Sequence, residues 1–169
     1  MSAFIEYLQG RGVAFTVLPR PQSDSALDTI RAHGVPAGEL ARTVVMHYRY
    51  GFAMMVIPAE AELNLSLAQT ALDDLDAREA TLREIHAQFA GTDGSCVPPL
   101  GLYFLAPMWV DPEIAGRDQV AFAAGKPSLV IRMSRADLFR DDPFVITPLT
   151  GVDQAKLAED ATAVVADIA

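Results

Sequence analysis

Residues 40–59 read LARTVVMHYRYGFAMMVIPA, and this segment organises the expected fold. Two runs rich in β-branched, aromatic and apolar side chains, 42–50 and 52–58, lie on either side of Gly51. Runs of this composition separated by a glycine are typical of the two strands of a β-hairpin. We therefore expect a β-hairpin here.

The segments before and after the hairpin carry helix and strand signals in turn. We expect helices at 2–9, 66–72, 81–90 and 152–168, and another that ends at His33 and is capped by Asp24 or Ser25. A helical turn is expected at 134–139, and strands at 13–19, 107–111, 119–123 and 128–133. Strands joined by short turns, with helices at the start, middle and end, predict an α+β domain with a mixed or barrel-like sheet. No Gly/Ser linker or repeat divides the chain, so residues 1–169 are expected to form a single domain.

Composition and charge exclude several classes of protein. The chain has 169 residues, of which 51% are hydrophobic, and this is far too apolar for a disordered protein. Its 13 basic and 22 acidic residues give a net charge of −9, with no basic arm for duplex DNA. The longest near-apolar stretch, 51–59, is too short to cross a membrane, and no signal peptide is evident, so we expect a cytoplasmic protein.

The cysteine and histidine content restricts the chemistry further. Cys96 is the only cysteine, which rules out an intrachain disulfide and a zinc site made of cysteines. The three histidines lack the spacing of zinc ligands, and no nucleotide-binding glycine motif is present, so we expect neither a metal nor a cofactor. Cys96 could be a nucleophile if a histidine lay beside it, or a small buried residue.

The loop GTDGSCVPPLG, residues 91–101, is the most unusual segment. Its glycines allow close backbone approach to a ligand, and its two prolines stiffen the chain. Such a loop can aim free N–H groups at a carbonyl or phosphate oxygen, or it can simply be a tight connection between a helix and a strand.

Arg42 stands at the start of the first hairpin strand, on the same face as Val44 and Met46. A single arginine beside an apolar face can bind a phosphate or carboxylate through two parallel hydrogen bonds, or it can be a solvated residue at a strand end. Met46 could line an adaptable pocket or pack in the core.

Five segments together resemble a known family. They are LARTVVM, FAMMVIPA, SCVPPLG, PMWVDPEI and VAFAAGKPSLVIRMS, and their order and spacing are similar to those of the YbaK family over about residues 13–140. This family comprises aminoacyl-tRNA deacylases related to the editing domain inserted in bacterial prolyl-tRNA synthetase. The resemblance implies an α+β fold with a mixed, twisted, barrel-like sheet, and hydrolysis of the ester that joins a wrong amino acid to the tRNA 3′ end.

The resemblance also implies roles for particular residues. A family lysine that approaches the terminal nucleotide corresponds to Arg42. Two adjacent glycines of the family's loop correspond to Ser95 and Cys96. A GxxxP motif is nevertheless present from Gly94 to Pro98, in a shifted register. A family histidine corresponds to Lys126. Backbone groups of Gly94, Ser95, Cys96 and Val97 are expected to act on the aminoacyl carbonyl, and the residues expected to bind substrate are Arg42, Val44, Met46, Pro98, Pro99, Gly101 and Gly125.

The implied substrate is the aminoacylated tRNA 3′ end, with water activated largely by substrate hydroxyls. An aminoacyl-tRNA synthetase or an elongation factor is the expected protein partner. Because Arg42 and the Ser95–Cys96 pair depart from the family pattern, a second interpretation stays open. In it, the chain is a binding module with the same fold and impaired catalysis, which recognises a tRNA 3′ end, a small aminoacyl-nucleotide or a protein.

Overall fold

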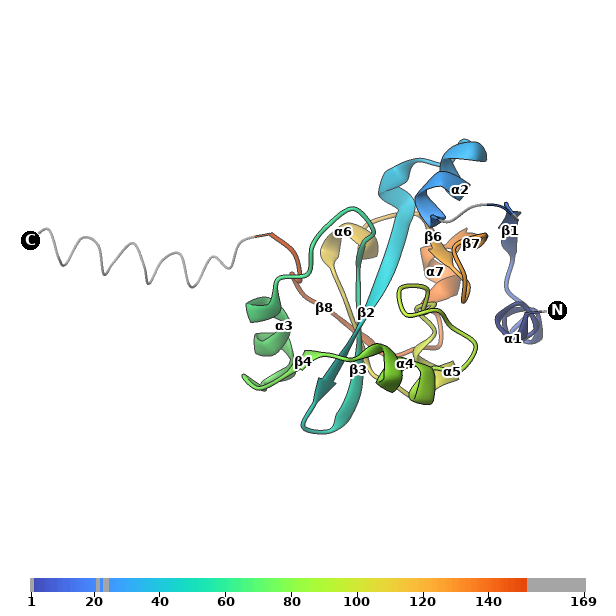
Figure 1. Cartoon of the computed structure of the whole chain (residues 1–169). Coiled ribbons are helices and arrows are strands. Elements are labelled where there is room, and N and C mark those ends of the chain that lie inside the picture. The colour runs from blue at the N-terminus through green and yellow to red at the C-terminus, as the bar shows by residue number, and fades with distance from the viewer. Residues whose placement is uncertain (1, 21, 23–24, 152–169) are drawn as a thin grey trace, which may run out of the picture.

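The structure is a computed structural model that describes residues 2–20, 22 and 25–151 of the chain. Its centre is the expected hairpin, formed by β2 (Leu40–Tyr48) and β3 (Gly51–Pro58). The strands pair antiparallel from Ala41 opposite Pro58 to Tyr48 opposite Gly51. Figure 1 shows this hairpin crossing the middle of the molecule, with α3 (Leu65–Leu72) on one side and α1 (Ala3–Gly10) on the other.

The described residues form one mixed sheet of eight strands, in the order β1-β7-β6-β2-β3-β5-β8, with β4 pairing beside β2. The remaining strands are β1 (Phe15–Pro19), β4 (Arg78–Glu79), β5 (Met108–Val110), β6 (Gln119–Ala123), β7 (Leu129–Ser134) and β8 (Phe144–Ile146). Parallel pairs join β2 to β6, β3 to β5 and β5 to β8. The predicted mixed α+β fold is confirmed, and its twisted sheet is open, with β1 and β8 at the two edges.

Most predicted helices are present, with the capping that their sequences suggest. The remaining helices are α2 (Ala26–Ala32), α4 (Leu82–Gln88), α5 (Gly101–Phe104), α6 (Pro112–Ala115), α7 (Arg135–Leu138) and the 3-10 turn η1 (Ala37–Glu39). Ser25 and Ser134 cap α2 and α7, and Thr81 with Glu84 forms a complete capping box on α4. The helix expected at 152–168 lies outside the described residues.

The two faces of the hairpin pack against different parts of the core. Val45 and Met54 face the main cluster, which includes side chains of α1 and α4. Val44 and Met46 face a second cluster with α3. The alternation expected along β2 is therefore confirmed, and the side chain of Met46 is completely buried in the core. Within the described part of the chain, no helix combines the length and the apolar character that a membrane span requires.

Asp111 fastens the last described segment to the sheet. Its carboxylate accepts hydrogen bonds from the N–H of Glu113, in the first turn of α6, and from the N–H of buried Leu149 at 2.9 Å. The hydroxyl of Thr150 donates to the same carboxylate. One buried side chain thus caps a helix and satisfies the backbone of a segment nearly 40 residues away.

Asp111→Ala is expected to lower the free energy of unfolding by about 2–4 kcal/mol, because it removes a helix cap and leaves a buried N–H without an acceptor. Urea unfolding measures this change. The exposed carboxylate of Asp118 provides the control, since Asp118→Ala should change stability by less than about 0.5 kcal/mol. Equal small effects of both substitutions would contradict this role for Asp111.

Candidate active site

The loop between α4 and α5 is fixed by two hydrogen bonds to the turn that joins β6 and β7. The N–H of Asp93 donates to the carbonyl of Gly125 at 2.8 Å, and the N–H of Gly125 donates to the carbonyl of Cys96 at 2.9 Å. Gly125 has φ of 93°, and a Cβ there would lie 2.5 Å from the carbonyl oxygen of Gly91. Glycine at this position therefore allows the loop to lie directly against the turn.

The loop leaves specific N–H groups free. The N–H of Cys96 donates to the carbonyl of Asp93 at 2.8 Å, so it is already used inside the loop. The N–H groups of Ser95 and Val97 have no acceptor among the described residues, and Pro98 and Pro99 carry no N–H. The donors available to a ligand are thus those on either side of Cys96.

Arg42 supplies a positive charge that is not neutralised nearby. Its side chain is half-buried, and its Nη2 donates to the carbonyl of Ala61 at 2.9 Å. Arg42 has no acidic partner within the part of the chain described here, whereas Arg132 is paired with Glu39 at 2.8 Å. The carbonyl of Ala61 orients the guanidinium without cancelling its charge.

Arg42 and Ser95 line the same two cavities. The first, which we call the Arg42 cavity, measures about 360 Å³ and is also lined by Ala41, Cys96, Val97 and residues 25–27 at the start of α2. The second measures about 260 Å³ and runs along the edge of β2 between Arg42 and Val45, facing Gly94 and α4. The arginine and the loop that the sequence singled out are therefore neighbours.

The other predicted site residues are placed in different surroundings. Val44 lines the cavity along the edge of β2. Pro98, Pro99 and Gly101 form the buried C-terminal end of the loop, and a Cβ on Gly101 would lie 3.0 Å from the carbonyl oxygen of Ala106. None of the three lines either cavity, and Met46 lies in the core beside α3.

The structure also adds residues that sequence patterns did not single out. The start of α2 and the turn residue Pro127 line the Arg42 cavity. Thr43 lines the neighbouring cavity, and its buried hydroxyl has no hydrogen-bond partner in the described residues. The alternation along the strand put Thr43 and Arg42 on opposite faces of β2. Thr43 lines a cavity because the loop packs against this part of β2.

Cys96 has the properties of a buried thiol, not of a nucleophile. Burial raises the pKa of the Cys96 thiol, and this effect exceeds the opposing contact with the Ser95 hydroxyl at 3.7 Å. The thiol is therefore protonated at neutral pH. No histidine lines either cavity, and no cluster of potential metal ligands occurs in the described residues.

Comparison with known proteins identifies the family. A model of the aminoacyl-tRNA editing domain matches residues 20–140, more than half of the chain. The chain belongs to this family. The resemblance predicted from the five segments is thereby confirmed, and no curated protein matches the chain.

Solved structures show the same fold at low sequence identity. One is titled "Crystal structure of a putative trans-editing enzyme for prolyl tRNA synthetase", with 22% identity, a TM-score of 0.77 and coverage of 88% of this chain and 95% of that one. A hypothetical protein has 20% identity and a TM-score of 0.76, and the match covers 88% of this chain and 99% of that one. A scaffold from an epitope-grafting design study has 19% identity and a TM-score of 0.74, covering 90% and 100%.

The buried Cys96 thiol predicts slow alkylation that depends on pH. Because burial raises its pKa, the thiolate should form only above the ordinary range near 8.5. The rate of reaction with iodoacetamide, measured against pH on folded protein and on protein in urea, should therefore have a higher midpoint when folded. A folded-state midpoint below that of the protein in urea would contradict this account and show that Cys96 is an activated thiol.

Proposed function

We propose that this protein is a freestanding trans-editing aminoacyl-tRNA deacylase that hydrolyses the ester of mischarged tRNA. The observation that carries the proposal is the Arg42 cavity, in which a cation and a loop with free N–H groups face the same space. An esterified terminal adenosine needs these two elements, since its phosphate is anionic and its carbonyl becomes an oxyanion during hydrolysis.

The proposed reaction uses backbone groups of the loop. Water attacks the ester carbonyl, and the N–H groups of Ser95 and Val97 stabilise the negative charge that develops on its oxygen. The bond from the carbonyl carbon to the ribose oxygen then breaks, which releases the free amino acid and a tRNA with its hydroxyl restored. One oxyanion donor typically contributes about 3 kcal/mol to the transition state.

No protein nucleophile is required in this scheme. Cys96 is neutral at physiological pH, and the cavity contains no histidine to activate it. The family resemblance suggests instead that substrate hydroxyls activate the water. This fits a cavity whose described lining includes one arginine and two serines but no histidine or carboxylate side chain.

Arg42 is proposed to hold the ribose or phosphate of the terminal adenosine. Its half-buried position and its hydrogen bond to Ala61 already restrict its side-chain rotamers, so less conformational entropy is lost on binding. The amino acid would be selected by the size of the cavity, and one methylene is worth only about 1–3 kcal/mol in such a pocket. This limited discrimination is why a separate hydrolytic step improves fidelity.

The charge of the chain bears on how substrate is delivered. A net charge of −9 opposes tight binding of tRNA by charge alone. We infer that a synthetase or an elongation factor presents the charged tRNA, and that the protein acts in the cytoplasm, where translation takes place.

A second candidate function is a binding module with the same fold and little catalysis. Two observations favour it: the N–H of Cys96 is already bonded to Asp93, and the guanidinium of Arg42 is bonded to Ala61. Both groups would then stabilise the shape of a binding site. That site would hold an aminoacylated tRNA end, an aminoacyl-nucleotide or a protein partner without hydrolysing it.

Purified protein should accelerate deacylation of at least one member of a panel of mischarged tRNAs. Arg42→Ala should lower kcat/KM about 10- to 100-fold, because a hydrogen bond to a charged group contributes about 1.5–3 kcal/mol. Arg49→Ala removes the same charge from the exposed tip of the same hairpin and should leave the rate unchanged. No acceleration with any member at high protein concentration rejects the deacylase.

A triple revertant separates the two candidate functions. Arg42→Lys, Ser95→Gly and Cys96→Gly together restore the family pattern at three of the four positions that depart from it, and Lys126 is left unchanged. If the protein is a deacylase, the natural chain hydrolyses its substrate. The rate of the revertant should then lie within about tenfold of the natural rate, because tenfold corresponds to one modest interaction. Hydrolysis that appears only in the revertant would establish the binding module instead.

A further inference from the structure

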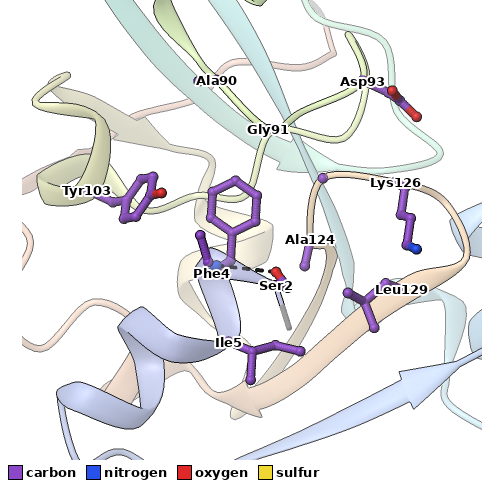
Figure 2. A pocket seen from close by; sticks show the side chains of 12 residues that line it. Ser2, Phe4, Ile5, Ala90, Gly91, Asp93, Tyr103, Ala124, Lys126 and Leu129 are labelled. Carbon is purple, nitrogen blue, oxygen red and sulfur yellow. Dashed lines mark hydrogen bonds between the residues drawn. The ribbon is translucent and has the colours of Figure 1, made fainter.

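A third and larger cavity lies beside the loop, next to α1 (Figure 2). This cavity, here called the α1 cavity, measures about 660 Å³ and is lined by the first turn of α1, by Gly91 and Asp93 of the loop, by Tyr103, and by residues 124–126 and Leu129. A volume of this size is typical of sites for ligands as large as a nucleotide. The deacylation proposed above makes no use of it.

The α1 cavity and the Arg42 cavity share a wall. Gly91 and Asp93 line the α1 cavity, while the next loop residues, 95–97, line the Arg42 cavity. In the same way residues 124–126 line the former, and their neighbours Ala123 and Pro127 line the latter. The two hydrogen bonds through Gly125 close this wall. A polymer that fills one cavity with its terminal unit thus passes close to the other.

The α1 cavity offers two uncommitted charges and an apolar interior. Lys126 and Asp93 are both exposed, and the side chain of neither forms an ion pair or hydrogen bond to any described residue. Figure 2 shows both side chains on the same side of the cavity, beyond the ring of Phe4. The half-buried side chains of Ile5, Tyr103 and Leu129 form the accessible apolar lining. Phe4 is buried behind them and meets Tyr103 edge to face with centroids 5.2 Å apart.

These groups match the parts of a pyrimidine nucleotide. Aromatic and aliphatic side chains contact the faces and edges of a base. A lysine ammonium binds a phosphate. A carboxylate accepts a hydrogen bond from the exocyclic amino group of cytosine, whereas uracil presents an acceptor oxygen at that position.

We propose that the α1 cavity binds the penultimate nucleotide of the tRNA 3′ end, the cytidine that precedes the terminal adenosine. Lys126 contacts its phosphate, and Asp93 accepts from the amino group of its base. This inference rests on the proposed function, because it places the esterified adenosine in the Arg42 cavity. Because the chain is negatively charged, attraction to the phosphates contributes little to tRNA binding. Recognition of the cytidine base would add affinity that does not depend on net charge.

The test compares tRNAs that carry cytidine or uridine at the penultimate position, acylated by a ribozyme so that no synthetase reads the change. For the natural protein, kcat/KM should fall about tenfold with uridine, the typical effect of one lost base contact. Asp93→Asn should bring this ratio close to one, because an amide can accept from cytosine or donate to uracil. Asp118→Asn, a control at an exposed carboxylate, should keep the tenfold ratio.

Lys126→Ala should lower kcat/KM equally for both tRNAs and should reduce the slope of log(kcat/KM) against log[salt] by about one. A cytidine-to-uridine ratio of one in the natural protein overturns the inference, as does a tenfold ratio that persists in Asp93→Asn. Either result can be obtained with full deacylation, so it leaves the proposed function intact.

A binding measurement covers the case in which no hydrolysis occurs. Cytidine 5′-monophosphate should shift the amide resonances of Gly91 and Gly125, and uridine 5′-monophosphate should shift them less at equal concentration. Such shifts without hydrolysis would reject the deacylase and retain the cytidine site. Free amino acids that shift these resonances while cytidine 5′-monophosphate does not would overturn the cytidine site.

Discussion

The pair of hydrogen bonds between the loop and Gly125 is the constraint on which the rest of the site depends. Asp93 donates to the carbonyl of Gly125, whose own N–H donates to Cys96. These bonds hold a glycine- and proline-rich segment in one conformation, so its free N–H groups need no reordering when a ligand arrives. They also lie in the wall between the Arg42 cavity and the α1 cavity, so the same two bonds help to shape both cavities.

The hairpin provides the other half of the site through simple strand geometry. Val44, Met46 and Tyr48 of β2 pack in the cluster with α3, and Arg42 comes next on the same side of the strand. Beyond these residues the side chain of Arg42 can turn toward Ala61 and the edge of the loop, where its charge is only partly desolvated. A cation at this point costs little stability and faces a cavity in which an anion can be held.

Local sequence signals were sufficient to predict the hairpin and the capped helices. Gly51 between two apolar runs, and Thr81 three residues before Glu84, act within a few residues of chain, so their structural meaning does not depend on the rest of the fold. The strands β4 and β8 have only two and three residues. They are too short for any alternation to be visible, and they exist because neighbouring strands offer them hydrogen bonds.

The site could be predicted in its parts but not in its arrangement. Arg42 and the loop were evident from residue type, and the family pattern suggested that they act together. The bonds of Gly125 to Asp93 and Cys96, and the contribution of α1 to a cavity, depend on contacts between distant segments. A close backbone approach such as that between Gly91 and Gly125 leaves no periodic pattern in a sequence beyond the glycines themselves.

The central claim is that the loop N–H groups and Arg42 bind an aminoacylated adenosine together. A crystal structure of the protein with an adenosine nucleotide that carries the amino acid through a stable 3′-amide tests it most directly. The account predicts the amide carbonyl oxygen about 2.7–3.1 Å from the nitrogens of Ser95 and Val97, with the guanidinium of Arg42 at the ribose or phosphate. A ligand bound outside the Arg42 cavity, or one whose carbonyl points away from the loop, would contradict it.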